Sequence, residues 1–331
     1  MTEEQNMENG NVSDAGAPVI LHRPVMVDEI LELFDMVGRP DALVVDCTLG
    51  AGGHAEAILS RNPAVRYVGI DADPEARERA GARLRPYADR LEIRAGYFDE
   101  VLASWSSNHD FARPDFVFFD LGVSTHHYLD SGRGFSFAGD EPLDMRFSPD
   151  LETSAYDLVN RLKENDLADI IYQYGEERYS RRIARAVVEA RRNSPVRTSG
   201  ALASIVAGAV PPAYRHGRIH PATRTFQALR IKVNNELERE EKALAEAAGI
   251  LAPGGILAVI TFHSLEDRIA KLLCRDYGRN REYRDIYHKP RIPTDRECSD
   301  NPASRSAKLR ALRAPMALSA GEAGKANEAT P

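Results

Sequence analysis

The chain has 331 residues, and at about 150 residues per domain this length suggests two domains or one domain with a large insertion. Hydrophobic residues make up 43%, charged residues 28% and mean hydropathy is -0.40, which excludes a disordered chain, a fibrous repeat and a polytopic membrane protein. The net charge is -7, yet residues 161–235 contain 14 lysines and arginines against 6 acids, and residues 268–313 contain 13 against 6. Two basic segments on an acidic body suit a polyanion-binding protein or, equally, solvated helix faces.

Alternating helix and strand patterns fill the first part of the chain. Residues 1–18 are acidic and poor in large apolar side chains, which predicts a disordered tail. A helix is expected near residues 24–37, and further helices at 53–61 and 74–84. Strands are expected at residues 42–46, 67–71, 91–95 and 116–121. Such alternation predicts parallel strands joined by crossover helices.

The pattern changes after Asp120. Residues 154–210 predict several short amphipathic helices without a strand, typical of an inserted helical domain. The α/β pattern returns with one long helix from about residue 222 to 251, a Pro-Gly-Gly turn and an apolar strand at 256–262. We therefore predict one α/β domain made of residues 19–128 and 222–314, an inserted domain at 129–221 and a disordered tail at 315–331.

A glycine-rich turn follows the first predicted strand, in VVDCTLGAGGH at residues 44–54. Gly50, Gly52 and Gly53 let the backbone approach a ligand, and the helix that follows offers free N–H groups. Asp71 ends the next strand, where an acid can accept hydrogen bonds from both hydroxyls of a ribose. Together these features predict a site for a cofactor that contains a nucleoside.

Dehydrogenases and methyltransferases share this arrangement. The turn lacks the spaced GxGxxG that makes room for a pyrophosphate, and S-adenosylmethionine has no pyrophosphate. We expect Asp46 to border the ligand, where its charge disfavours a diphosphate and tolerates a sulfonium or an ammonium group. The residues favour a methyltransferase that uses S-adenosylmethionine over an NAD-dependent oxidoreductase.

A second motif, FFDLGVS, ends the fourth predicted strand and brings Asp120 and Ser124 to the carboxyl edge of the sheet. A nucleobase amine is conjugated and weakly nucleophilic, so its methylation benefits from an acceptor that orients the N–H and takes the proton. Asp120 is the candidate acceptor, with Ser124 beside it. The alternative is a structural role in which Asp120 caps and orders the loop.

Two later motifs carry charge or polar groups. HPATRTFQALRIKVNNEL at residues 220–237 combines apolar positions at helical spacing with Arg224 and Arg230, which are candidate RNA-binding residues. FHSLEDR at residues 262–268 is expected to be a loop that shapes the pocket, because its residues have no metal-ligand spacing and no nucleophile elbow. No metal site is predicted.

The three cysteines form no CxxC pair, which argues against a disulfide framework or a zinc site and favours a reducing cytoplasm. No apolar run approaches the roughly 18 residues that cross a bilayer, and the N-terminus has no signal pattern. Cys47 is the cysteine nearest the glycine turn, and we expect it at the wrong strand end to attack a base. Methyl transfer without a covalent base intermediate is therefore expected.

These motifs, in this order, resemble the bacterial small-subunit ribosomal RNA cytosine-N4 methyltransferase family of the RsmH, formerly MraW, type. The resemblance runs from HRPVMVDEIL at residue 22 through VDCTLGAGGH, GIDADPEA, DLGVS, RGFSF, PLDMRF and YGEERYSRRIARAVV to HPATRTFQALRIKVNNELE, ITFHSLEDRIAK and NPASRSAKLR. It implies a Rossmann-like class I methyltransferase sheet interrupted by an inserted helical domain. It also implies S-adenosylmethionine as cofactor and N4 of a cytidine in the decoding centre of 16S rRNA, within the small ribosomal subunit, as target.

Site residues follow from the resemblance position by position. The positions that match the family's cofactor site are Gly52, Gly53, His54, Asp71, Phe98, Asp120 and His127. The chain departs from the family after DLGVS, where His127 stands in place of a glutamine that the family uses at the cofactor, and at Ala303, where an arginine is common. A non-catalytic ribosome-assembly factor that keeps the cofactor fold remains an alternative.

RNA is expected to bind the basic inserted domain. Arg181 and Arg185 are four residues apart and share one face of a predicted helix, which makes them the candidate phosphate contacts. The alternative is that they pair with acids such as Glu176 and Glu177. A soluble, cytoplasmic protein with no membrane partner is expected.

Overall fold

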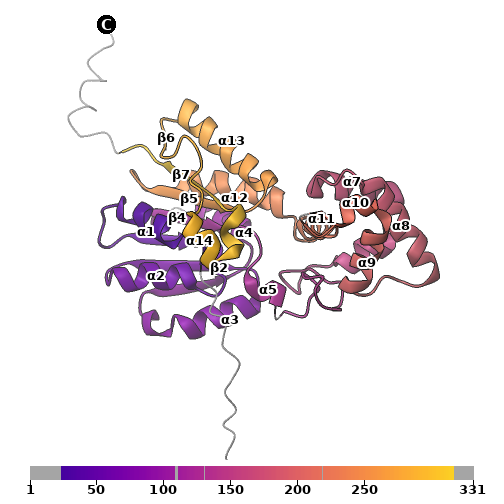
Figure 1. The fold of residues 1–331 in the computed structure, drawn as a ribbon. Coiled ribbons are helices and arrows are strands. Elements are labelled where there is room, and N and C mark those ends of the chain that lie inside the picture. The colour runs from indigo at the N-terminus through magenta and orange to yellow at the C-terminus, as the bar shows by residue number, and fades with distance from the viewer. Residues whose placement is uncertain (1–23, 109–110, 130, 218, 317–331) are drawn as a thin grey trace, which may run out of the picture.

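The computed structural model describes residues 24–316 except 109–110, 130 and 218. The N-terminal tail predicted at 1–18, and all but two residues of the C-terminal one, lie outside this range. One sheet and a lobe of helices make up the described chain, and α5 (Thr125–Leu129) lies where the two meet (Figure 1). Among the helices of the described residues, none has the length and apolar character that crossing a bilayer requires.

The sheet has seven strands in the order β3-β2-β1-β4-β5-β7-β6. Its five parallel strands are β1 (Leu43–Asp46), β2 (Arg66–Asp71), β3 (Leu91–Ala95), β4 (Phe116–Asp120) and β5 (Ile256–Thr261). The last two, β6 (Arg284–Asp285) and β7 (Lys308–Arg313), extend it antiparallel beyond β5. All five predicted strands are present, whereas β6 and β7 are additions to the prediction.

Side chains alternate between two apolar layers because successive residues of a strand face opposite sides of the sheet. On one face, Val44, Phe116 and Phe118 pack against α1 (Val27–Asp35), α2 (Gly53–Arg61) and α3 (Pro74–Arg83). On the other, Val45 and Phe119 pack against α4 (Phe98–Ser107), α12 (Glu236–Ile250) and α13 (Ser264–Asn280). The result is the three-layer α/β/α architecture expected from alternating strand and helix patterns.

The helical lobe has its own core. It consists of α6 (Ala155–Arg161), α7 (Glu164–Gly175), α8 (Ser180–Asn193), α9 (Ser199–Ala209), α10 (Pro212–Arg215) and α11 (Thr223–Asn234) (Figure 1). Phe226, Leu229 and Val233 of α11 belong to this core and pack with α7. Helix α11 falls within residues 222–314, which the sequence predicts as part of the α/β domain, but it packs as part of the insertion.

The long helix predicted for residues 222–251 is broken at Asn235, so this prediction is wrong. Asn235 has a left-handed backbone with φ of 53°, a conformation that asparagine tolerates better than most residues. The neighbouring Asn234 is buried, and its side-chain amide bonds Met145 and Phe147 from another segment of the insertion. Because the helix is broken at Asn235, α11 packs in the core of the lobe and α12 packs against the sheet.

Two of the longer helices differ from the sequence prediction. Helix α4 is an addition to it, and α13 forms where the sequence predicts a loop at FHSLEDR. His263 caps α13, with its Nδ1 accepting from the backbone N–H of Glu266, while the Glu266 carboxylate accepts from the backbone of His263. This is a capping box with histidine in the place of the usual serine or threonine.

Candidate cofactor and catalytic site

The carboxyl ends of β1, β2 and β4 surround a cavity of about 490 Å³. This volume lies within the range of about 300–1,000 Å³ usual for small-ligand sites, and the edge is where open α/β sheets bind ligands. The predicted site residues that line it are Gly53, His54, Asp71, Phe98, Asp120, Ser124 and His127. A larger cavity of about 740 Å³ beside α14 (Asp295–Asp300) shares only Gly53 with the predicted site.

The glycine turn shapes one wall of the cavity. Gly50 and Gly52 have φ values of 53° and 78°, which side chains rarely adopt. A Cβ on Gly52 would lie 2.9 Å from Cδ1 of Leu84. Gly52 is not among the cavity-lining residues, so its contribution is to let the turn form and start α2.

Asp71 lies at the end of β2 and is fixed by backbone donors. Its Oδ2 accepts from the N–H of Gly50 at 2.8 Å, and its Oδ1 accepts from the N–H of Asp73 at 2.8 Å. Burial raises the pKa of Asp71, and these two hydrogen bonds act against that rise. Each carboxylate oxygen can accept a further bond, so the group is oriented to receive two hydroxyls.

Asp120, at the end of β4, has one carboxyl oxygen without a hydrogen-bond partner among the described residues. Its backbone N–H donates to Oγ1 of Thr48 at 2.6 Å. Its carboxylate Oδ2 lies 3.7 Å from Nδ1 of His54, while the buried Oδ1 accepts no hydrogen bond from any described residue. Burial, followed by the charges of Asp46 and Glu266, raises the pKa of Asp120 well above its usual value. An orphaned carboxyl oxygen in a cavity wall is suited to a donor on a ligand.

His54 links the glycine turn to Asp120. Its Nε2 lies 2.9 Å from the carbonyl oxygen of Val25, which assigns the donor hydrogen to Nε2. The ring is buried and packs edge-on against Phe118, at 4.7 Å between centroids. These contacts hold the imidazole beside the Asp120 carboxyl.

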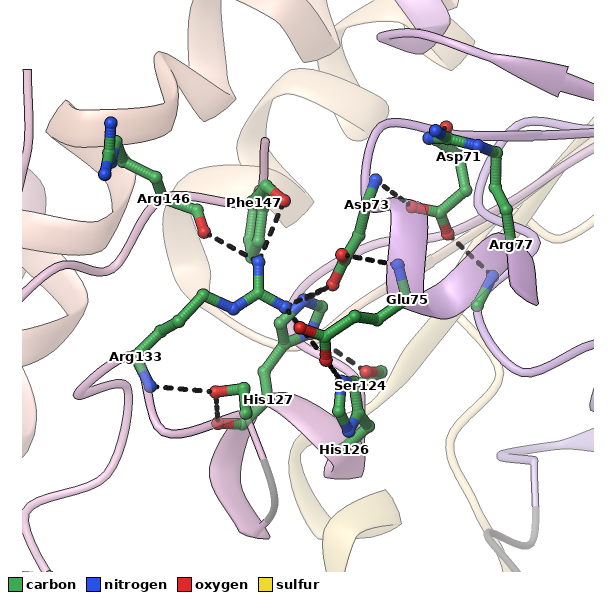
Figure 2. A network of polar contacts seen from close by, with 12 residues as sticks. Asp71, Asp73, Glu75, Arg77, Ser124, His126, His127, Arg133, Arg146 and Phe147 are labelled. Atoms are coloured by element: carbon green, nitrogen blue, oxygen red, sulfur yellow. Dashed lines mark hydrogen bonds and ion pairs between the residues drawn. The ribbon is translucent and has the colours of Figure 1, made fainter. Parts of the chain in front are cut away.

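A polar network joins the cavity to the inserted segment (Figure 2). Nδ1 of His127 lies 2.9 Å from Oγ of Ser124, and its Nε2 lies 2.8 Å from Oδ2 of Asp73. Arg133 bonds the same Oδ2 of Asp73 at 2.5 Å, and the carbonyl oxygen of Phe147 at 3.0 Å. Sequence reasoning missed Asp73 and Arg133, although the charged residues inside GIDADPEA and SGRGFSF were a visible signal.

Two expectations about the first strand are wrong. Asp46 does not line the cavity: it is buried, its Oδ1 accepts from Thr48 and its Oδ2 accepts from the hydroxyl of Tyr67. Burial raises its pKa to about 7. Cys47 does line the cavity, on the ligand side of the strand, but burial raises the pKa of its thiol well above the usual range, which disfavours the thiolate.

The four arginines predicted to bind RNA divide into two kinds. Arg181 and Arg185 of α8 are exposed and pair with Asp169 and Glu164 of α7, at 2.7 and 3.6 Å. These acids, rather than Glu176 or Glu177, are their partners. In α11, Arg224 donates to the carbonyl of Glu176, and Arg230 is buried in a two-bond pair with Glu236.

One cluster of possible metal ligands has no metal-ligand spacing in the sequence. Ligand atoms of Glu236, His263 and Glu266 lie within 4.8 Å of one another. However, Arg230 holds both oxygens of Glu236, and Glu266 accepts from the backbone N–H groups of Phe262 and His263. The cluster is an ion pair joined to a helix cap.

Comparisons with known proteins match the chain to one family. A model of the MraW methylase family matches residues 19–314. A protein from Treponema denticola named ribosomal RNA small subunit methyltransferase H is 46% identical over 311 residues, which cover 88% of this chain and 97% of that protein. Proteins of the same name from Syntrophobacter fumaroxidans and Persephonella marina are 46% and 44% identical, over 89% of this chain and 97% and 99% of theirs. An rRNA methylase structure from Streptococcus thermophilus, 9% identical, covers 86% of this chain and 95% of its own with a TM-score of 0.40.

Proposed function

Because the chain belongs to the MraW methylase family, we propose that it methylates N4 of a cytidine in the decoding centre of 16S ribosomal RNA with S-adenosylmethionine. Three relatives named ribosomal RNA small subunit methyltransferase H match it over nearly their whole length, which supports the rRNA substrate. The cytidine and its N4 atom rest on the motif resemblance and on the chemistry of Asp120.

The cavity fits the cofactor in size and in chemistry. Asp71 presents a carboxylate already oriented by two backbone donors, as recognition of a ribose requires. Phe98, fixed edge-on against Phe119, offers a ring at the same cavity for an adenine. S-adenosylmethionine supplies an electrophilic methyl group on a sulfonium cation, and a cation in this cavity favours the ionised form of Asp120.

The unpartnered Oδ1 of Asp120 is the observation that carries the proposal. An ionised Asp120 accepts a hydrogen bond from an exocyclic amine, orients its lone pair and takes the proton that methylation releases. The alternative, that Asp120 caps its own loop, requires a bond from that loop, and Oδ1 accepts none from the described residues.

Chemistry at carbon is disfavoured by the cavity's own cysteine. C5 methylation of a pyrimidine needs a thiolate nucleophile, and burial holds Cys47 in the thiol form. Cys274 is remote in sequence and packs in the sheet core. Transfer to nitrogen without a covalent base intermediate is consistent with these residues.

Mass mapping of methylated cytidines in 16S rRNA tests the proposal. Cells that lack this protein should lose one N4-methylcytidine signal, and the intact chain should restore it. The matched control is a chain with Asp120→Ala, which should fold and associate with the subunit without restoring the mark. Restoration by Asp120→Ala, or no change on deletion, would instead favour the assembly-factor alternative.

A further inference from the structure

The imidazole of His127 is enclosed by two aromatic rings and two hydrogen-bond partners. It lies between the rings of Phe135 and Phe147, with centroids at 4.9 and 5.1 Å, and it is buried. Both nitrogens are engaged, Nδ1 by Ser124 and Nε2 by Asp73. The ring therefore has no nitrogen left for a ligand, although its family counterpart suggested a direct cofactor contact.

The partners of His127 fix its tautomer. Burial alone would raise the pKa of Asp73, but hydrogen bonds from His127 and Arg133 lower it to about 2, so Asp73 is an anion and can only accept. Nε2 of His127 must carry a hydrogen, and in the neutral ring Nδ1 is then an acceptor. The Ser124 hydroxyl donates to it, which leaves only lone pairs of Oγ for the cavity that Ser124 lines.

We propose that Ser124 binds a hydrogen-bond donor of the cofactor, a hydroxyl or an amine, and that His127 is the positioning residue that makes Ser124 an acceptor. The inference rests on the proposed function only in taking S-adenosylmethionine as the ligand. Ser124 thus takes over a role that the histidine at position 127 cannot fill.

Calorimetry with purified full-length protein measures this without any RNA. We would titrate S-adenosylmethionine and S-adenosylhomocysteine at one fixed pH. S-adenosylhomocysteine lacks the sulfonium charge, so a loss of affinity shared by both ligands does not arise from an altered interaction with that charge. The variants are Ser124→Ala and His127→Gln, with His126→Gln as the matched neighbour and exposed His216→Gln as the remote control.

Ser124→Ala should weaken both ligands by about 2- to 12-fold, the effect of one hydrogen bond. His127→Gln should weaken them by a similar factor, and the double variant by no more than Ser124→Ala alone, because both changes act through the same hydrogen bond. His126→Gln should lose less affinity than His127→Gln, and His216→Gln should lose none. An NMR spectrum of the imidazole nitrogens should show the hydrogen of His127 on Nε2 and none on Nδ1.

Three results would overturn the inference. They are unchanged affinity in Ser124→Ala, unchanged affinity in His127→Gln, or a hydrogen on Nδ1 of His127 in the NMR spectrum. Failure of the proposed function looks different, because the unmodified chain would then bind neither ligand.

Discussion

Charged side chains lie in different surroundings at the sheet-edge cavity and on the helical lobe. Around the cavity, burial raises the pKa of Asp71 and Asp120, and one carboxyl oxygen of Asp120 has no partner among the described residues. On the lobe, the side chains of Arg181 and Arg185 are 61% and 69% exposed and pair with acids across α7 and α8. Exposed pairs are worth about 0–1 kcal/mol and are screened by salt.

This difference indicates how each region can work. Removing one polar group at a buried, unpaired carboxyl has a large effect, because no water molecule takes the place of the lost group. An exposed arginine can exchange an acid for a phosphate at little cost, so binding by the lobe depends on the sum of many charges. We therefore expect large effects from single substitutions at the cavity and small, cumulative effects on the lobe.

The largest effect is expected at Asp120. Asp120→Ala should lower the methyl-transfer rate by about 10²–10⁴ while leaving cofactor affinity largely intact, since a positioned proton acceptor contributes that much. Single-turnover rates with saturating RNA measure it. If rate and cofactor affinity fall together, Asp120 is a binding residue and the acceptor lies elsewhere.

The same group predicts the acid limb of the pH profile. Asp120 accepts a proton only when ionised, and its raised pKa means that the unmodified enzyme should lose activity on acidification well above the 3.8 of an ordinary aspartate. Asp120→Asn has no carboxyl to titrate, so its residual rate should lack this limb. A limb that persists unchanged in Asp120→Asn would assign it to another group.

Arg230 of α11 joins the helical lobe to α12 through its pair with Glu236. It was predicted to bind RNA, but its side chain is 10% exposed and pairs with Glu236. Arg230→Ala leaves the largely enclosed carboxylate of Glu236, 13% exposed, without its ion pair and should lower the free energy of unfolding by about 3–5 kcal/mol. Denaturant unfolding measures this, and the double variant Arg230→Met with Glu236→Leu should recover much of the loss. A stable Arg230→Ala protein with weakened RNA binding would restore the RNA-binding role.

Asp71 should show an intermediate effect on binding alone. Asp71→Ala removes the acceptor proposed for the ribose hydroxyls and strands the N–H groups of Gly50 and Asp73. Cofactor affinity should fall by about 1–3 kcal/mol, measured by calorimetry. Asp71→Asn keeps the shape and one acceptor oxygen and should lose less. Equal binding by a folded Asp71→Ala protein would remove Asp71 from the site.

The smallest effect is expected on the lobe. Arg181→Ala with Arg185→Ala should weaken RNA binding modestly and reduce the slope of log K against log salt by about 0.7–0.9 for each phosphate that the variant no longer neutralises. Cofactor affinity should not change. Asp169→Ala with Glu164→Ala, which frees both arginines, is the matched control and should leave the slope intact or steepen it. An unaltered slope in the arginine variant would mean that these residues serve only the pairing of α7 with α8.

Local pattern determined much of this protein in advance. Short, continuous apolar runs mark the buried parallel strands and a period of 3.6 marks the helices, so the parallel sheet and the helical insertion could be predicted. Asp71 and Asp120 could be placed at one edge because the carboxyl ends of parallel strands meet there. The glycine turn carries its own geometry, since the positive φ of Gly50 and Gly52 requires that residue type.

Only the tertiary structure decided which partner each polar group meets. Arg230 is buried against Glu236 because the left-handed Asn235 turns α11 away from α12. One ring nitrogen of His127 is engaged by Asp73, which lies 54 residues earlier in the chain. Contacts over such separations depend on how packed layers bring distant segments together, and no local periodicity encodes them. The chemistry at the ends of the strands was therefore visible in the sequence, whereas the tautomer of His127 and the polarity of Ser124 were not.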